Sequence, residues 1–377
     1  MLAIIYLSGI AAPISQFKVP PMMRQLMAEF DISLAASGWL MSLFTLVGLI
    51  CAIPIGILIK RFGVKEASLA ALGLLLAGSV TGIYAPSVTV MLASRIMEGA
   101  GMCIFSISAP AAIAAWFPPN KRGMPTGIWA TWVPAGTIIM YIAAPMLGVN
   151  GWRHVWWFAI GYTVLMLLLC LIFFQMPETN EETEKNKTEL TLPAGFIRNI
   201  CLLAATFMLF NIITISTKSY LPVFLEIARN YPPGKASGTI NIMVIVSLFT
   251  GPLTGALSDK TGSRKFFLVM GCVIACIAAA VPFTAGGLLP AAALFMLGVS
   301  CGNVATVSFA SASEIAGSSN RASLALSVVI FGQYMGMSAG PVLFSTTAAS
   351  FGWQTAALFL VPVAFLASIC AFSVKIK

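Results

Sequence analysis

The sequence predicts an all-α membrane protein with twelve transmembrane helices in two pseudo-symmetric six-helix bundles. Three observations lead to this prediction. The 377-residue chain is 59% hydrophobic and only 9% charged, whereas soluble domains are about 25% charged. Its apolar residues fall into runs long enough to cross a bilayer, which takes roughly 20 residues per helix. Landmark residues of the first half recur in the second.

Each apolar run is predicted to be a helix, because an open strand would leave backbone groups unpaired in lipid. The runs lie near residues 2–27, 34–59, 66–84, 88–116, 124–148, 154–175, 199–226, 237–257, 265–284, 288–315, 322–346 and 354–374.

One long polar stretch divides the chain. Residues 177–190 read PETNEETEKNKTEL, a composition typical of a flexible, solvated tether. We therefore expect an N-terminal six-helix bundle over 1–175, a cytoplasmic linker over 176–198 and a C-terminal six-helix bundle over 199–377.

The distribution of Lys and Arg predicts the orientation. Most of the 21 basic residues fall in loops on the side that holds both termini, so the positive-inside rule places both termini in the cytoplasm and the chain in the cytoplasmic (inner) membrane. This topology accounts for the net charge of +9 without a nucleic-acid partner. The first apolar run is too long for a signal peptide and is expected to remain as a helix.

The sequence gives little support for a metal site or a cofactor-binding site. All eight cysteines lie in apolar runs without CxxC spacing, and His154 is the one histidine. We interpret the cysteines as small core residues. No metal site and no cofactor are expected. A membrane-embedded enzyme is disfavoured because no nucleophile–base pair or acidic cluster is present.

An internal repeat supports the two-bundle prediction. Gly56 recurs as Gly255, 199 residues later, within GILIKRFG and GALSDKTG. Gly151–Trp152 recurs as Gly352–Trp353 at an interval of 201. Because each half has an even number of helices, the halves should share one orientation and be related by an axis along the membrane normal.

With these motifs the chain resembles the major facilitator superfamily. The segment GALSDKTGSRK (255–265) matches the family's loop motif well, and GILIKRFGVK (56–65) matches it in part. Arg95, Gly99 and Gly101 match the family's R-x-x-x-G-x-G motif. The segment FPPNKRGMPTGIWATW (117–132) is similar to the cyanate-permease and nitrate-type anion branch. The resemblance implies secondary transport by alternating access, with helices 1 and 7 lining a central cavity.

Two lysines stand where membrane helices normally carry apolar residues. Lys18, within SQFKVPPMM, and Lys218 lie at similar depths of helices 1 and 7. A cation in lipid costs at least about 2.5–3.5 kcal/mol, so such residues usually face water, a partner or a ligand. Two cations facing one cavity favour an anionic substrate. The alternatives are that Lys18 snorkels to the headgroups or pairs with Glu29 or Glu98.

Polar and aromatic residues on the same and neighbouring helices could shape the substrate site, although plain packing is the favoured interpretation of each aromatic. The predicted substrate-binding residues are Lys18, Lys218, Gln16, Asn211, Thr214, Trp129, Gln333 and Tyr334.

Arg95 and Glu98 are spaced to pair on one helix. Glu98 is the acid nearest mid-membrane in the predicted spans and is the candidate for proton coupling; a static Arg95–Glu98 brace is the alternative. The resemblance further implies a conformational latch at the cytoplasmic face, in which Asp259 meets the start of helix 5. The latch residues are predicted to be Asp259, Lys121, Arg122 and Arg264.

The predicted function is secondary transport of a small anion, with an organic carboxylate favoured over others. Transport is expected to be coupled to protons if Glu98 titrates. The chain is expected to act as a monomer in the lipid bilayer. Two alternatives in the same family are a proton-coupled drug or metabolite exporter and uptake of a small inorganic anion such as cyanate or nitrate. A transporter-like receptor that binds without moving its ligand also stays open.

Overall fold

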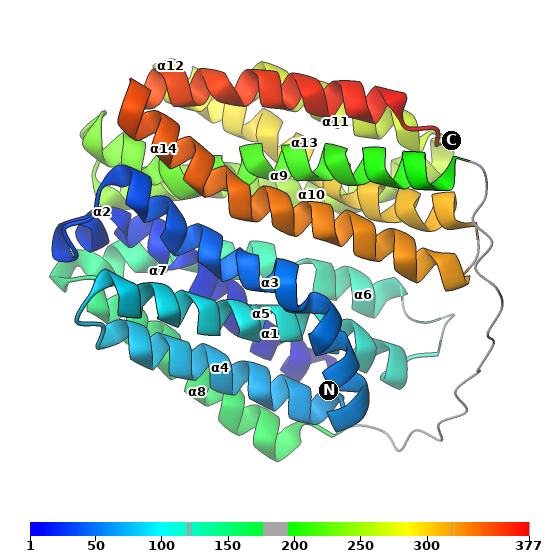
Figure 1. The fold of residues 1–377 in the computed structure, drawn as a ribbon, viewed down its shortest axis with the longest axis horizontal. Coiled ribbons are helices and arrows are strands. Elements are labelled where there is room, and N and C mark those ends of the chain that lie inside the picture. The colour runs from blue at the N-terminus through cyan, green and yellow to red at the C-terminus, as the bar shows by residue number, and fades with distance from the viewer. Residues whose placement is uncertain (119–120, 122, 176–194, 318, 377) are drawn as a thin grey trace. The chain divides into compact units, whose positions relative to one another are not determined.

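The computed structural model describes residues 1–118, 121, 123–175, 195–317 and 319–376, and every regular element among them is helical (Figure 1). In chain order the elements are α1 (Leu2–Phe17), α2 (Val19–Glu29), α3 (Leu34–Phe62), α4 (Val64–Ile83), α5 (Val88–Trp116), α6 (Gly123–Ala130), α7 (Trp132–Leu147), the 3₁₀ turn η2 (Gly148–Asn150), α8 (Arg153–Phe173), α9 (Phe196–Ile227), α10 (Pro233–Thr261), α11 (Arg264–Ala278), α12 (Val281–Thr284), α13 (Leu289–Ala316) and α14 (Ser319–Ser373).

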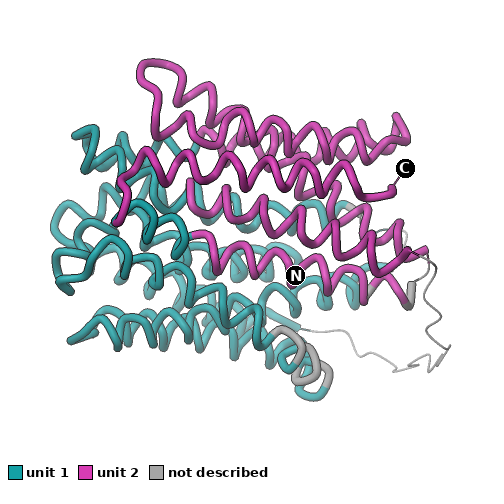
Figure 2. The backbone as a smooth tube through the Cα atoms, turned by 45° about the horizontal axis from the view of Figure 1, so that its top comes forward, with its two compact units in different colours: residues 1–178, 218–241, 341–349 teal, residues 179–217, 242–340, 350–377 magenta. Residues whose placement is uncertain are grey.

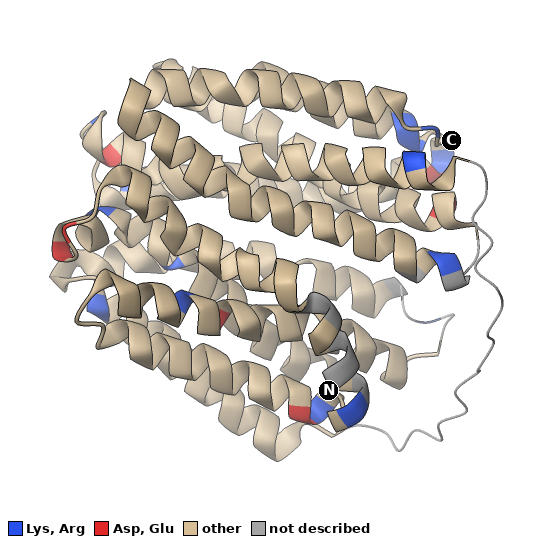
Figure 3. Cartoon of the chain, viewed as in Figure 1, with Lys and Arg blue, Asp and Glu red and all other residues tan. Residues whose placement is uncertain are grey.

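The predicted all-α membrane architecture is confirmed. Eleven helical stretches among the described residues are long and apolar enough to span a bilayer. The last of them belongs to α14, whose 55 residues are interrupted at Gly352, where φ is 83° and ψ is 165°. Divided there, α14 supplies two spans, consistent with the twelve predicted. Charged residues gather at the helix ends, and few interrupt the spans (Figure 3).

The described chain forms two compact units (Figure 2). Unit 1 comprises residues 1–178, 218–241 and 341–349, and unit 2 comprises 179–217, 242–340 and 350–377. In unit 1, α5 packs against α3 and α4, and α1 packs against α5, α7 and α8; in unit 2, α13 packs against α11 and α12. The predicted linker falls mostly outside the described residues, so the division into 1–175 and 199–377 remains a prediction.

Four glycines of the repeat have a positive φ, two at equivalent positions in each half. Gly63 and Gly262, which close the two loop motifs, have φ of 94° and 66°; Gly151 and Gly352, each followed by tryptophan, have φ of 119° and 83°. L side chains rarely adopt such angles. The recurrence of glycine at these two pairs of positions therefore has a structural cause.

A second kind of equivalent glycine lies inside the helices. A Cβ on Gly99 of α5 would collide with the carbonyl group of Phe44 on α3, and a Cβ on Gly298 of α13 would lie 2.7 Å from the carbonyl oxygen of Met243 on α10. Both pairs are related by 199 residues. Close backbone approach at small residues is how helices associate in lipid, and here the same contact is found at equivalent positions of the two units.

Candidate functional site

The first predicted span is broken at Lys18. α1 ends at Phe17 and α2 begins at Val19, with Pro20 and Pro21 in its first turn. Proline has no N–H to donate to the carbonyl four residues earlier, so Pro20 leaves the carbonyl of Gln16 without its helical donor. In a membrane, such a group needs another partner.

Arg95 of α5 supplies that partner. Its Nη2 donates to the Gln16 carbonyl at 3.4 Å and its Nη1 to the Ser15 carbonyl at 2.8 Å, while Nε donates to the Leu40 carbonyl on α3 at 3.0 Å. The guanidinium also lies 4.5 Å from the centroid of the Phe44 ring. The arginine therefore ties the broken helix to α3 and α5.

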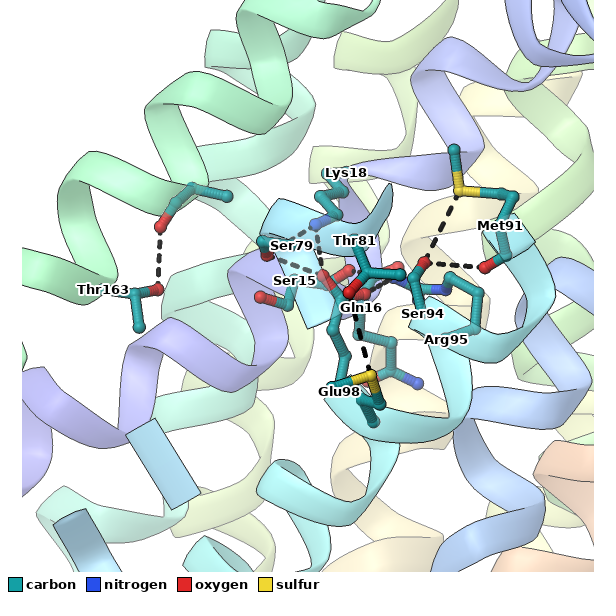
Figure 4. Close-up of polar contacts among 12 residues, drawn as sticks. Ser15, Gln16, Lys18, Ser79, Thr81, Met91, Ser94, Arg95, Glu98 and Thr163 are labelled. Carbon is teal, nitrogen blue, oxygen red and sulfur yellow. Dashed lines mark hydrogen bonds and ion pairs between the residues drawn. The ribbon is translucent and has the colours of Figure 1, made fainter. Parts of the chain in front are cut away.

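Lys18 projects from the break into a fully buried polar cluster (Figure 4). Its Nζ donates to Oε1 of Glu98 at 2.5 Å and to Oγ of Ser79 at 2.9 Å. Ser79 in turn donates to Oε1 of Glu98 at 2.6 Å, and Arg95 Nη1 donates to Oε2 of Glu98. We call Lys18, Ser79, Arg95 and Glu98 the buried charge cluster; the four side chains come from α1/α2, α4 and α5.

The cluster carries two cations and one carboxylate, so one positive charge is left over. The side chains of Lys18, Arg95 and Glu98 are all 0% exposed. Lys18 Nζ also lies 4.5 Å from the centroid of the Trp156 ring on α8, a contact with an electron-rich face that stabilises a desolvated cation. The residual charge is thus spread over aromatic faces and backbone carbonyls.

Unsatisfied polar atoms lie on the turn just before the break. Both the Nε2 and the Oε1 of Gln16, a fully buried residue, lack a hydrogen-bond partner in the described part of the chain, as does the Oγ of Ser15. A buried amide without partners is costly. Such a group is the kind of feature that a bound water or ligand satisfies.

The structure places Lys18 and Lys218 in the same unit but in different surroundings. Lys18 is paired with Glu98, which is one of the two alternatives predicted for it. Lys218 on α9 is partly exposed, and no carboxylate among the described residues lies within ion-pair distance. Its backbone carbonyl accepts a 2.6 Å bond from the Tyr141 hydroxyl, and the Tyr141 ring packs 6.1 Å from that of Phe17, next to Lys18.

The other predicted binding residues divide between the units. In unit 1, Trp129 stacks on Trp132 with a ring separation of 4.6 Å and packs closely on Gly9 of α1, the arrangement expected from packing alone. In unit 2, Asn211 and Thr214 bond to carbonyls of their own helix, α9.

Gln333 and Tyr334 are both half-buried on α14 in unit 2. They neighbour Gly336, whose missing Cβ lets α14 approach the Asn211 side chain and the Met208 carbonyl of α9. In unit 2, α9 and α14 carry the predicted binding residues, and these two helices are therefore in direct contact.

The predicted latch residues are placed only in part. Asp259 accepts a 3.3 Å bond from Arg264, which also lies 3.4 Å from Glu314, so these three residues form a network within unit 2. Lys121 is exposed in unit 1, and Arg122 lies outside the described residues. The network with Glu314 was not predicted, and the latch between Asp259 and Lys121 remains a prediction.

Ser79 and Trp156, which complete the surroundings of Lys18, were not predicted, because a serine and a tryptophan are ordinary residues in membrane helices. Glu226, which is only 7% exposed near the end of α9, was not predicted either. Its acidic character at the edge of an apolar run was the available signal.

Comparison with known proteins agrees with this architecture. A family model described as Major Facilitator Superfamily matches residues 5–323. A probable nitrate transporter of Staphylococcus carnosus is 22% identical over 69% of this chain and 68% of its own, and a nitrite extrusion protein of Bacillus subtilis is 24% identical over 68% and 65%.

Solved structures show the same fold. A bacterial homologue of the human lysosomal transporter Spinster, inward-facing and occupied, superposes with a TM-score of 0.82 at 16% identity, covering 98% of this chain and 95% of that one. A D-xylose–proton symporter gives a TM-score of 0.82 at 16% identity, covering 100% and 97%.

Proposed function

The chain belongs to the Major Facilitator Superfamily and is a multi-pass membrane transporter of a small molecule, and we propose that its substrate is a small oxyanion, an organic carboxylate before others. One observation carries the proposal. The buried charge cluster holds one more positive than negative charge, and beside it lies the buried amide of Gln16, which has no hydrogen-bond partner among the described residues. An oxyanion would supply both the missing negative charge and acceptors for the amide.

Lys218 adds a second cation for the substrate. It is partly exposed on α9, and its helix is held next to Phe17 through Tyr141. A charge-assisted hydrogen bond to an oxyanion is worth about 1.5–3 kcal/mol, more than a neutral amide could provide. Lys218 is therefore proposed as the residue that meets the anion, with the cluster behind it supplying the electrostatic field.

Proton coupling through Glu98 follows from the same charge balance. Protonation of Glu98 would leave Lys18 and Arg95 without a counter-charge in a buried site, which is strongly unfavourable. Entry of an anion would replace the negative charge that the proton cancels. Proton and anion binding would then favour each other by linkage, which is the condition for symport by a single chain.

The relatives favour a second candidate of the same chemistry. The two proteins named for nitrate and nitrite act on inorganic oxyanions that, like a carboxylate, present planar oxygens to cations. A proton-coupled exporter of drugs or metabolites is the alternative outside this chemistry, and transport measurements separate all three.

The test is current recorded on solid-supported membranes from vesicles containing the purified chain, with jumps of monocarboxylate, dicarboxylate, nitrate, nitrite or an organic cation. We expect oxyanions alone to evoke a response, which is a current where net charge moves and a binding transient where one proton accompanies one monoanion. Lys218→Met should raise the half-saturating anion concentration at least roughly tenfold, since a factor of ten corresponds to about 1.4 kcal/mol.

Lys235→Met is the matched control, because Lys235 is an exposed lysine of the same unit that packs on the Tyr231 ring. It should leave the anion response unchanged. Currents evoked by the organic cation and insensitive to Lys218→Met would overturn the oxyanion proposal and favour the exporter.

A further inference from the structure

Glu226 is a buried carboxylate that the proposed site does not use. It lies in the last turn of α9 and is 7% exposed, and among the described residues no hydrogen bond or ion pair holds its carboxylate. Glu98, by contrast, receives bonds from Lys18, Ser79 and Arg95. Of the two buried acids in the described part of the chain, Glu226 is thus the one that can change its protonation state without breaking a cluster.

Glu226 belongs to a seam within unit 1. We define the seam as residues 218–227 of α9 and 341–345 of α14 where they meet α3 and α7. Neutral contacts hold it together. Tyr220 and Ser37 share a hydroxyl–hydroxyl bond of 3.1 Å, and Ser345 donates to the Ala35 carbonyl at 3.1 Å.

The seam is also closely packed. A Cβ on Gly38 of α3 would lie 2.9 Å from both the Pro341 carbonyl oxygen and the Val342 Cα of α14. Tyr220 stacks on Phe344 with a ring separation of 5.5 Å. Residues 218–227 are thus held between α3 and α14, and Glu226 shares their burial.

Few charges face Glu226. Arg24 on α2 is the cation whose field acts on it. On its own side of the seam lie Lys218, two turns earlier, and Arg229, whose guanidinium stacks on Phe224. Glu29 is held by Arg153 at 2.7 Å. Residues 34–45 of α3, all of α7 and residues 341–349 contain no Asp, Glu, Lys, Arg or His.

We propose that Glu226 is a second proton-binding residue of this transporter and that its protonation state decides whether the seam is closed or open. A carboxylate that loses water without gaining a hydrogen-bond donor is costly to bury in its charged form. The closed seam therefore accepts Glu226 most readily with a proton bound, and ionised Glu226 favours an open, hydrated seam. Arg24 offsets part of this cost.

The direction of the pH effect follows. Acid conditions favour the closed seam and alkaline conditions the open one. Loss of Arg24 would remove the attraction that favours ionised Glu226, so the closed seam would persist to higher pH. A seam that closes only after taking up a proton would link that proton to the conformational cycle independently of the substrate's identity.

The experiment measures a distance across the seam. Spin labels are placed at Ala28→Cys, an exposed position in the last turn of α2, and at Ala228→Cys, an exposed position just after α9. The full-length chain lacks its eight native cysteines and is reconstituted in lipid nanodiscs. Double electron–electron resonance between pH 5 and pH 8.5 should show a long-distance population that grows with pH. Glu226→Gln, a mimic of the protonated form, should keep the short distance throughout.

Three variants sharpen the result. Glu226→Asp should retain the pH response, Arg24→Gln should move its midpoint to higher pH, and Glu29→Gln, which removes an exposed carboxylate of the same region, should leave it unchanged. A Glu226→Gln protein whose distances change with pH like those of the parent would overturn the proposal. No substrate is present, so the outcome does not depend on whether the oxyanion proposal is correct.

Discussion

Glu98 is the counter-charge for two buried cations, and its three donors account for all the strong contacts of its carboxylate. Glu98 pairs with Lys18 and with Arg95 at once, so both of the ion pairs that the sequence offered as alternatives are present, while proton coupling stays a proposal. A static brace and a coupling residue are therefore not separate hypotheses here, because any protonation of Glu98 must disturb the brace.

Glu98→Gln should destabilise the protein by about 3–5 kcal/mol, because removing one member of a buried ion pair leaves its partners uncompensated. The free energy of unfolding can be followed by tryptophan fluorescence in mixed micelles. Adding Lys18→Met to Glu98→Gln should recover part of the loss, since it removes one uncompensated cation.

Glu29→Gln is the control for this measurement. The Glu29–Arg153 pair is about half exposed, and exposed pairs contribute about 0–1 kcal/mol. Equal losses for the two glutamates would show that the buried cluster has no special electrostatic role.

The sequence marks Lys18, Lys218, Arg95 and Glu98 as anomalous because charges are rare in apolar runs. It does not specify which of them meet, because partner choice depends on the rotation of each helix about its axis. Lys18 is adjacent to a double-proline break, so its direction departs from that of a regular helix. Ser79 and Trp156 contact the amino group of Lys18, but neither residue is unusual in an apolar run.

The break between α1 and α2 and the close contacts between α3 and α5 depend on the same segment of α5. Pro20 leaves the Gln16 carbonyl without a helical donor, and Arg95 donates to that carbonyl. Gly99, one turn along α5, lets the backbone of α3 approach. Arg95 bonds to carbonyls of both α1 and α3. The family motif thus positions three helices through one arginine and one glycine.

Gly99→Ala and Gly298→Ala should each destabilise the chain by about 1–3 kcal/mol, because the added methyl group meets a neighbouring helix backbone that cannot move aside. Thermal unfolding in detergent is a suitable measurement. Gly73→Ala on α4 is the control, since a Cβ there meets nothing within 4 Å, and it should leave the unfolding temperature unchanged or slightly higher. Similar losses at all three positions would contradict the close-contact explanation.

For the chain as a whole, composition and run length were enough to predict the membrane-spanning helices, and the interval of about 200 residues was enough to predict the repeat. The physical reason is that lipid admits few architectures. Substrate identity could not be predicted in this way, because it depends on a few side chains whose directions the repeat does not determine. The burial of Glu226 is an example, since it follows from how residues 218–227 pack against α3 and α14.

The orientation of the chain is open to a direct test. The positive-inside rule predicts both termini in the cytoplasm, so a green fluorescent protein fused after Lys377 should fluoresce and alkaline phosphatase fused there should be inactive. Phosphatase inserted after Asn230, between α9 and α10, should be active. The opposite pattern would reverse the predicted topology.

The buried charge cluster also has a consequence for biosynthesis. Lys18 emerges from the ribosome 80 residues before Glu98, so it enters the bilayer with no counter-charge and bears an insertion cost of at least about 2.5–3.5 kcal/mol. Arg95 and Glu98 arrive together on α5. A nascent chain that ends before α5 therefore holds an unpaired cation, and the first five helices are the shortest product in which Lys18, Arg95 and Glu98 can all find their partners.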